Sequence, residues 1–421
     1  MRTPKIVTTL KTYSWALFRE DAVAGVTVAM VAIPLSLAIA IASGAAPETG
    51  LFTAIVGGFL VSLLGGSRVQ IGGPTGAFIV VVFGVIADHG YDGLVLATFM
   101  AGILLLIAAY FRLGRMVQYV PESVVNGFTI GIAVIIATSQ IKDLLGLSLT
   151  DVPADFIPKI AAFWAARDSI NLPVVAVSLV SIVLIVGLRM KFPKFPGLIV
   201  AVVVASAGAV WLDLPVDTIA SRFGALPDSL PVPALPEISV PRVLELLPSA
   251  LVIAFLAGVE SLLSAMVADR MIQGAHRPNA ELLAQGSANL ASSLVGGLPV
   301  TGAIARTATN VRAGGKTPVA GLVHAVTVLA VMMLAAPLAG RMAMPALAAI
   351  LILTAWNMSE PQKWRSYAAA PVGDRLLLLL TLVLTVVIDL TVAIGIGVAV
   401  GLVLRRYQGR LQPDKWRIPK R

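Results

Sequence analysis

Long apolar runs, separated by short polar or glycine-rich breaks, fill almost the whole chain. The runs are continuous rather than alternating, so they predict helices and not the strands of a membrane β-barrel. Several are shorter than the ~20 residues that a helix needs to cross a bilayer fully. We predict fourteen membrane segments, over residues 22–43, 51–64, 68–87, 92–110, 118–140, 172–189, 196–212, 244–268, 279–295, 299–313, 318–337, 343–357, 373–388 and 390–406.

Two polar stretches divide this series of segments. Residues 141–171 carry several charged side chains, and we expect them to lie at the membrane interface. Residues 213–243 are rich in proline and polar residues, which is typical of a linker. The linker separates a first half, residues 1–212 with segments 1–7, from a second half, residues 244–406 with segments 8–14. A basic tail follows over residues 407–421, which we expect to be cytoplasmic.

Composition places the chain in a membrane. Hydrophobic residues make up 58% of the sequence and charged residues 13%, against roughly 25% charged residues in an average soluble domain. So few charged residues cannot provide the polar surface that a soluble protein exposes to water. We therefore predict a multi-pass protein of the cell inner (plasma) membrane, surrounded by the lipid bilayer. The sequence has no cysteine, which excludes disulfides and thiolate metal sites.

The net charge of +9 comes largely from the two ends of the chain. Positive flanks stay in the cytoplasm, so we expect both termini there and an even number of segments. The charge is therefore no sign of a nucleic-acid partner. The sequence contains neither HExxH nor GxSxG, and we expect no enzymatic activity, no cofactor and no resident metal.

A short motif occurs once in each half. The sequence "GGPTGAF" around Thr75 resembles "LPVTGAI" around Thr301. Ser36 lies 39 residues before Thr75, and Ser261 lies 40 residues before Thr301. Because each half has an odd number of segments, the second half enters the membrane in the opposite sense. The pattern predicts an inverted repeat, which is typical of secondary transporters.

Both motifs break a helix at membrane depth. Gly72, Gly73 and Pro74 stop a helix from their N-terminal side, so we expect an extended stretch over 68–73 and a half-helix that begins near Pro74. In the second half the matching half-helix begins near Ile304. Non-helical backbone at this depth is tolerated only where protein or a water-filled cavity surrounds it.

The two half-helices are expected to point their N-termini at each other near the middle of the membrane. Each N-terminus offers unpaired N–H groups and about half a positive charge, so a small anion fits between them. We therefore predict that the residues around both breaks bind the substrate, namely Gly73, Pro74, Thr75, Gly76, Thr301, Gly302, Ala303, Ile304, Ala305 and Arg306.

Arg306 lies in the first turn of the second half-helix, within an apolar stretch. An arginine in a membrane costs from a few to about ten kcal/mol, so it needs a partner. One interpretation is a structural ion pair, for example with Glu260. The other, which we favour, is that Arg306 supplies the positive charge that an anionic substrate meets.

Glu260 is a second charged residue within an apolar segment, in the sequence "AFLAGVESLLSAMVADR". A buried carboxylate pairs with a cation, binds a metal ion or takes up a proton. We favour a proton, which makes Glu260 the coupling residue. The alternative is a sodium site built from Glu260 and backbone carbonyls around Gly302.

Four stretches carry a resemblance to a known family. They are "DAVAGVTVAMVAIPLSLAIA" (21–40), "VQIGGPTGAF" (69–78), "VNGFTIGIAVIIATSQIKDLLG" (125–146) and "GGLPVTGAIARTATNVRAGGKTPVAGLVHA" (296–325). With them, nearly the whole chain resembles the sulfate permease (SulP) family of anion transporters.

The resemblance implies an all-α membrane protein with fourteen segments in a seven-plus-seven inverted repeat, like the uracil-permease fold. It implies a core domain of segments 1–4 and 8–11 and a gate domain of segments 5–7 and 12–14. The anion site is expected between segments three and ten, and the protein is expected to be a homodimer. Family members usually continue into a cytoplasmic STAS domain, which this sequence does not contain.

The resemblance also assigns roles to single residues. Arg306 falls where the family has its anion-facing arginine, and Glu260 falls where bacterial members often carry an acid linked to proton or cation coupling. Pro34, Leu35 and Ile39 fall on the wall of the site formed by the first segment. Leu35 stands where many members have a glutamine, so one polar ligand of the anion is missing from this sequence.

These features predict a secondary active transporter that moves a small anion by alternating access. We favour proton-coupled symport of a dicarboxylate such as fumarate or succinate, with sulfate and bicarbonate as further candidates. The alternatives are a sodium-coupled bicarbonate or sulfate symporter and a passive anion channel or exchanger. A permease for a neutral nucleobase and a structural protein are disfavoured, because neither needs the costly Arg306.

Overall fold

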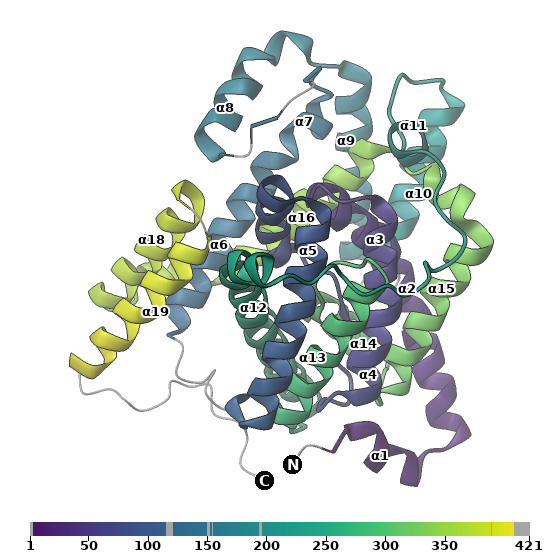
Figure 1. The fold of residues 1–421 in the computed structure, drawn as a ribbon. Coiled ribbons are helices and arrows are strands. Elements are labelled where there is room, and N and C mark those ends of the chain that lie inside the picture. The colour runs from purple at the N-terminus through teal and green to yellow at the C-terminus, as the bar shows by residue number, and fades with distance from the viewer. Residues whose placement is uncertain are drawn as a thin grey trace.

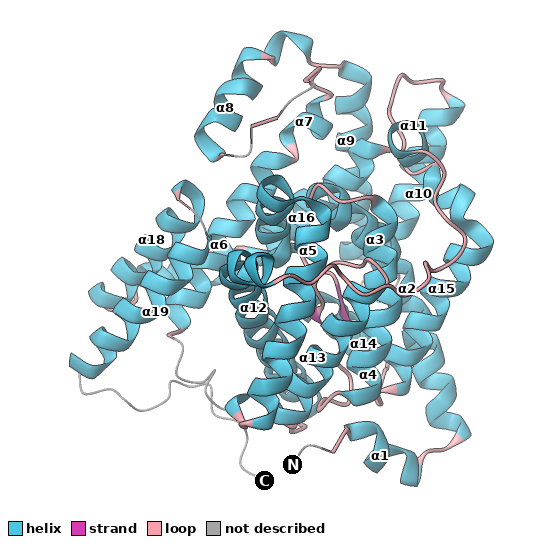
Figure 2. Ribbon diagram, viewed as in Figure 1, coloured by secondary structure: helices cyan, strands magenta, loops and turns pink. Residues whose placement is uncertain are grey.

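The computed structural model describes residues 3–114, 121–149, 152–153, 155–192, 196–388 and 390–407. These residues form helices joined by loops, the longest of which covers residues 224–239, and two very short strands lie at the centre (Figure 1, Figure 2). The basic tail predicted over 407–421 lies outside the described residues except for Tyr407.

The first half of the chain contains ten α-helices and one strand among its described residues. They are α1 (Lys5–Thr9), α2 (Trp15–Ala42), α3 (Pro47–Phe52), α4 (Gly58–Leu64), β1 (Gly72–Gly73), α5 (Ile79–Tyr110), α6 (Glu122–Ser139), α7 (Ile141–Leu145), α8 (Phe156–Ala165), α9 (Leu172–Lys191) and α10 (Gly197–Trp211). A π-helical turn, Thr53–Gly57, joins α3 to α4.

The rest of the chain follows the same plan. Its elements are α11 (Ile219–Phe223), α12 (Val240–Ile272), α13 (Pro278–Leu294), β2 (Thr301–Gly302), α14 (Ile304–Arg312), α15 (Val319–Gly340), α16 (Met344–Met358), α17 (Trp364–Ala368), α18 (Val372–Val387) and α19 (Leu390–Tyr407). Each of the fourteen predicted segments therefore contains helix among its described residues, and segments three and ten begin with an extended stretch. Segments three and four are the two parts of α5 on either side of a kink at Gly90.

Seven helical stretches of the described chain are long and apolar enough to cross a membrane. They are Trp15–Ala42, Pro47–Leu64, Gly76–Tyr110, Glu122–Leu145, Leu172–Lys191, Val240–Ile272 and Val319–Gly340. Together with the shorter segments they confirm the predicted all-α membrane fold.

Local sequence explains where the long helices begin. The Ser14 side chain accepts a hydrogen bond from the Leu17 backbone N–H at 3.3 Å and caps α2. Ser239 caps α12 in the same way, with a proline at its first turn. Because of this cap, α12 begins at Val240, so the predicted linker over 213–243 ends earlier than expected.

Helices from the two halves pack against each other. Helix α2 packs on α15, and α5 packs on α12 and α13. The crossing of α5 and α13 depends on two glycines, since a Cβ atom at Gly102 would lie 2.9 Å from the Gly286 carbonyl oxygen, and the reverse distance is also 2.9 Å. A second group forms where α6 packs on α16 and α18, and α9 on α16. Helix α8 lies at the end of the molecule opposite α1 (Figure 1).

Candidate functional site

The two predicted breaks meet at the centre of the molecule. Strand β1 pairs with β2 in an antiparallel register, with Gly72 opposite Gly302 and Gly73 opposite Thr301. The Ala303 backbone N–H extends the pairing by donating to the Ile71 carbonyl oxygen at 2.9 Å. The extended stretches expected before half-helices three and ten are thus present, and each satisfies the backbone of the other (Figure 2).

The two half-helices start differently. Helix α14 begins at Ile304, as predicted, with Ala303 extended at its N-cap. In the first half, Thr75 is still extended, a 3₁₀ turn covers Gly76–Phe78 and α5 begins only at Ile79. The first half-helix therefore begins at Gly76, two residues after the predicted start at Pro74. The Pro74 carbonyl, instead of starting a helical ladder, accepts a hydrogen bond from the Arg306 side chain.

Arg306 is buried, with 1% of its surface exposed. Its Nη2 donates to Ser36 Oγ at 3.1 Å and to the Pro74 carbonyl oxygen at 3.0 Å. Its Nε and Nη1 are buried and have no hydrogen-bond partner among the described residues. Within that part of the chain no carboxylate lies within 4.0 Å of the guanidinium, so the ion pair with Glu260 considered as an alternative does not form.

Gly73 makes room for the guanidinium. Its φ is +150°, and a Cβ atom there would lie 2.1 Å from Nη1 of Arg306. Any side chain at this position therefore collides with the arginine and strains the backbone. Gly302 has the same role on the other strand, where a Cβ atom would lie 1.6 Å from Nε2 of Gln70.

Glu260 lies on α12, close to the first break. Its Oε2 accepts a hydrogen bond from Thr75 Oγ at 2.9 Å. The Glu260 and Thr75 side chains are both partly exposed, unlike Arg306. The site therefore has a buried cation hydrogen-bonded to Pro74 and a partly exposed acid hydrogen-bonded to the next residue, Thr75.

A layer of buried polar residues behind the site was not predicted. Nε2 of Gln70 donates to Ser261 Oγ at 2.8 Å, and Ser261 Oγ donates to Oε1 of Glu281 at 3.0 Å. Thus Ser36 accepts from Arg306 and Ser261 accepts from Gln70, so each serine of the repeat binds a long side chain of the opposite half. The nearly equal spacing of the two serines from the breaks, 39 and 40 residues, marked these positions in the sequence, but no sequence pattern identified their partners.

The other predicted site residues lie around this centre. Thr301 is buried and its hydroxyl donates to the Ala257 carbonyl oxygen at 3.0 Å. Ile304 and Ala305, at the tip of α14, are exposed. Three residues of α2 predicted for the site wall are buried in the turns next to Ser36, namely Pro34, Leu35 and Ile39.

Two further helices close the site from the opposite side. A Cβ atom at Gly76 would lie 3.0 Å from Sδ of Met358 on α16 and 3.5 Å from Cδ1 of Ile136 on α6. The tip of the first half-helix therefore touches α6 and α16, which belong to the second packing group.

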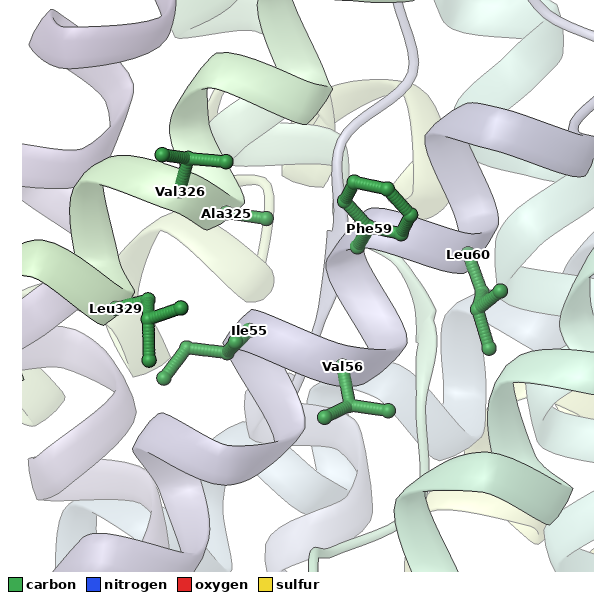
Figure 3. A pocket seen from close by; sticks show the side chains of 7 residues that line it. All are labelled: Ile55, Val56, Phe59, Leu60, Ala325, Val326 and Leu329. Carbon is green, nitrogen blue, oxygen red and sulfur yellow. The ribbon is translucent and has the colours of Figure 1, made fainter. Parts of the chain in front are cut away.

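This arrangement suits an anion and offers no cluster for a metal. Unpaired N–H groups of a guanidinium and the N-terminus of α14 both attract negative charge. Among the described residues no group of three or more His, Cys, Asp or Glu lies close enough to hold a metal ion. A separate pocket of about 330 Å³ lies between α15 and the stretch formed by the Thr53–Gly57 turn and α4; only apolar side chains line it, and none is a predicted site residue (Figure 3).

The fold and the paired breaks define a multi-pass membrane protein of the transporter type, built as two inverted halves around a central site. The chain belongs to the sulfate permease family, whose family model matches residues 18–381. The resemblance inferred from the motifs is confirmed.

Related proteins agree with this assignment. The chain is 42% identical over 372 residues to the "Putative sulfate transporter YvdB" of Bacillus subtilis, covering 88% of this chain and 70% of that protein. It is 32% identical over 342 residues to the "Bicarbonate transporter BicA" of Picosynechococcus sp., covering 79% of this chain and 60% of that protein.

Solved structures show the same fold. The transmembrane domain of a cyanobacterial bicarbonate transporter, BicA, superposes with a TM-score of 0.79 at 28% identity, covering 93% of this chain and 98% of that domain. The murine anion transporter Slc26a9 in its inward-facing state gives a TM-score of 0.87 at 17% identity, covering 97% of this chain and 71% of that one, which shows the fold alone.

Proposed function

We propose that the protein is a secondary active transporter of a small anion, bound between the tips of α14 and of the first half-helix. One observation carries the proposal: Arg306 is buried without a carboxylate among the described residues, and two of its nitrogens lack a partner. A cation left in this state at the N-terminus of a half-helix costs free energy, which an anion recovers by accepting those hydrogen bonds.

We propose that Gly73, Pro74, Thr75 and Gly76 form one side of the site. The second break, over residues 301–306, forms the other side. Main-chain N–H groups and Arg306 supply the positive charge, and the glycines allow the backbone to approach the ligand. Because Leu35 stands on the α2 wall instead of a polar residue, recognition rests on charge more than on side-chain hydrogen bonds to the anion.

Transport is proposed to occur by rocking two bodies against each other. The core contains α2–α5 and α12–α15, and the gate contains α6, α9, α10, α16, α18 and α19. Helix packing supports this division, since α5 packs on α12 and α13, while α6 packs on α16 and α18. The closeness of Gly76 to Ile136 and Met358 supports a site at the boundary between the two proposed bodies.

Glu260 is proposed to couple transport to a proton. Within the described chain, the Glu260 carboxylate has a single hydrogen bond, from Thr75, whose hydroxyl can donate to a carboxylate or rotate to accept from a carboxylic acid. The alternative is a sodium ion held by Glu260 and carbonyls near Gly302.

The names of the relatives favour sulfate or bicarbonate as the anion, with a dicarboxylate such as fumarate or succinate as the further candidate. We place the protein in the plasma membrane, as a homodimer with both termini in the cytoplasm.

Uptake into proteoliposomes tests the proposal. Labelled sulfate, bicarbonate, fumarate and succinate are each supplied with and without an inward proton gradient, and then with an inward sodium gradient. Accumulation of one anion only with the proton gradient supports the proposal as stated. Accumulation that follows sodium moves Glu260 to a cation ligand, and mere equilibration under every gradient contradicts active transport.

A further inference from the structure

Lys159 on α8 is a buried cation far from the site in sequence. Only 5% of its surface is exposed. Its Nζ lies 5.3 Å from the centre of the Phe83 ring on α5 and 3.5 Å from Ser139 Oγ on α6. The ammonium thus lies between the two helices α5 and α6. Its own helix, α8, lies at the end of the molecule opposite α1 (Figure 1).

No carboxylate lies within 4.0 Å of Lys159 in the part of the chain that the structure describes. Asp155, at the N-cap of α8, is the acidic group whose charge acts on it. Desolvation lowers the pKa of Lys159, and Asp155 opposes this shift. One 3.5 Å hydrogen bond and one aromatic ring compensate poorly for the burial of an ammonium group.

The same two helices flank Lys159 and the candidate site. Near the site, Gly76 lies against Ile136 of α6. Phe83 follows Gly76 by seven residues, about 10 Å further along the helix, and Ser139 follows Ile136 by one turn. The seam between α5 and α6 therefore runs from the substrate site to Lys159, and α8 covers its outer end.

We propose that Lys159 is an outer docking group for the transported anion, the first cation that the anion meets when it enters along the α5–α6 seam. The ligand is a small inorganic or carboxylate anion. Separation of α8 from α5 exposes the ammonium, and the anion replaces the Phe83 ring as its partner before it moves on to Arg306. This inference rests on the proposed anion site and adds a binding step that occurs at only one face of the membrane.

A purely structural lysine predicts something different. If Lys159 only anchors α8, its loss disturbs transport from both faces of the membrane equally. A docking group acts on one face, because an anion arriving from the face of α1 reaches Arg306 without passing α8. Sidedness is therefore the decisive readout.

The experiment measures anion exchange in vesicles of both orientations, so that the half-saturation concentration is obtained for each face. We expect Lys159→Gln to raise this concentration at least fivefold for anion supplied at the α8 face, with less than a twofold change at the other face. Lys159→Arg keeps the charge and should stay within twofold of wild type. Arg167→Gln is the matched control, since it removes an exposed cation just beyond α8.

Chemical rescue provides a second test, because the natural chain contains no cysteine. Lys159→Cys should show the same sided defect, and aminoethylation of the thiol should reverse it, whereas a neutral methylthio group should not. Equal effects on both faces, no effect on either, or rescue by the neutral group overturns the proposal. Arg306→Ala separates the two hypotheses. Normal transport by this variant rejects the anion site itself. If Arg306→Ala loses transport but Lys159→Gln raises the half-saturation concentration equally on both faces, only the docking step is rejected.

Discussion

The Thr75 hydroxyl of the first half donates a hydrogen bond to Oε2 of Glu260 in the second half, at 2.9 Å. The preceding residue, Pro74, accepts a hydrogen bond from Arg306 at 3.0 Å. The proposed anion-binding cation and the proposed coupling acid are therefore tied to adjacent residues of one extended segment. A change of hydrogen-bond partner at Arg306 or at Glu260 acts on the same Pro74–Thr75 dipeptide. Anion binding and proton binding can therefore influence each other directly, without intermediate residues.

Removal of the Arg306 side chain should weaken anion binding. A lost pair of charge-assisted hydrogen bonds, at about 1.5–3 kcal/mol each, corresponds to roughly 100- to 10,000-fold in affinity. Arg306→Ala should therefore abolish uptake at low anion concentration, and Arg306→Lys should restore it only in part, since an ammonium lacks the planar fork. Arg312, exposed at the end of the same helix, is the control: Arg312→Ala should bind and transport normally.

Neutralisation of Glu260 should separate binding from coupling. Glu260→Gln keeps the shape and a polar group for Thr75 but cannot exchange a proton. We expect it to bind the anion and to exchange it across the membrane, without accumulating it under a proton gradient. Glu237, exposed in the linker, is the control. If Glu260→Gln accumulates the anion as well as Glu237→Gln does, the coupling role is wrong.

Gly73 should not tolerate a side chain. The added Cβ of Gly73→Ala meets Nη1 of Arg306 at 2.1 Å in a backbone conformation that is strained for alanine, at a cost of about 1–3 kcal/mol. We expect lower thermal stability and loss of uptake. Gly84→Ala, in the helix that follows, has no atom within 4 Å of the new methyl and should leave both properties unchanged. Similar behaviour of the two variants contradicts the close packing of the strands against Arg306.

Asp21 should be more important for stability than its neighbour Glu20. Its buried carboxylate accepts from the Lys316 and Thr317 backbone N–H groups at 2.8 and 3.1 Å, from the Thr317 hydroxyl, and from Tyr13 at 3.1 Å. Asp21→Asn turns an amide group toward these donors and should cost about 1–3 kcal/mol.

Glu20 provides the comparison for this prediction. It pairs with Lys316 at 2.6 Å in an exposed position, so Glu20→Gln should cost about 0–1 kcal/mol. Melting temperatures in detergent measure both variants. Equal shifts mean that the Asp21 contacts do not hold α2 against the start of α15.

Much of the fold could be read from local features of the chain. The apolar runs were sufficient to predict the fourteen segments. The Pro- and Gly-rich breaks around Thr75 and Thr301, with Ser36 and Ser261 at nearly equal distances before them, were sufficient to predict the inverted repeat. These features are local because, in a bilayer, a membrane segment must normally form its backbone hydrogen bonds within its own helix. Where a helix is interrupted, residues such as proline and glycine at that point of the sequence indicate the break. For the same reason Arg306 stood out as a costly charge.

Only the tertiary structure decided which side chains meet. Thr75 and Glu260 lie 185 residues apart, Gln70 and Ser261 191, and Arg306 and Ser36 270. No local pattern fixes such pairs, because they depend on how two inverted halves dock and on which glycines let the backbones approach. The extended Thr75 is an example: Pro74 favours a helix start, but the hydrogen bond from Arg306 and the pairing of β1 with β2 outweigh that local preference.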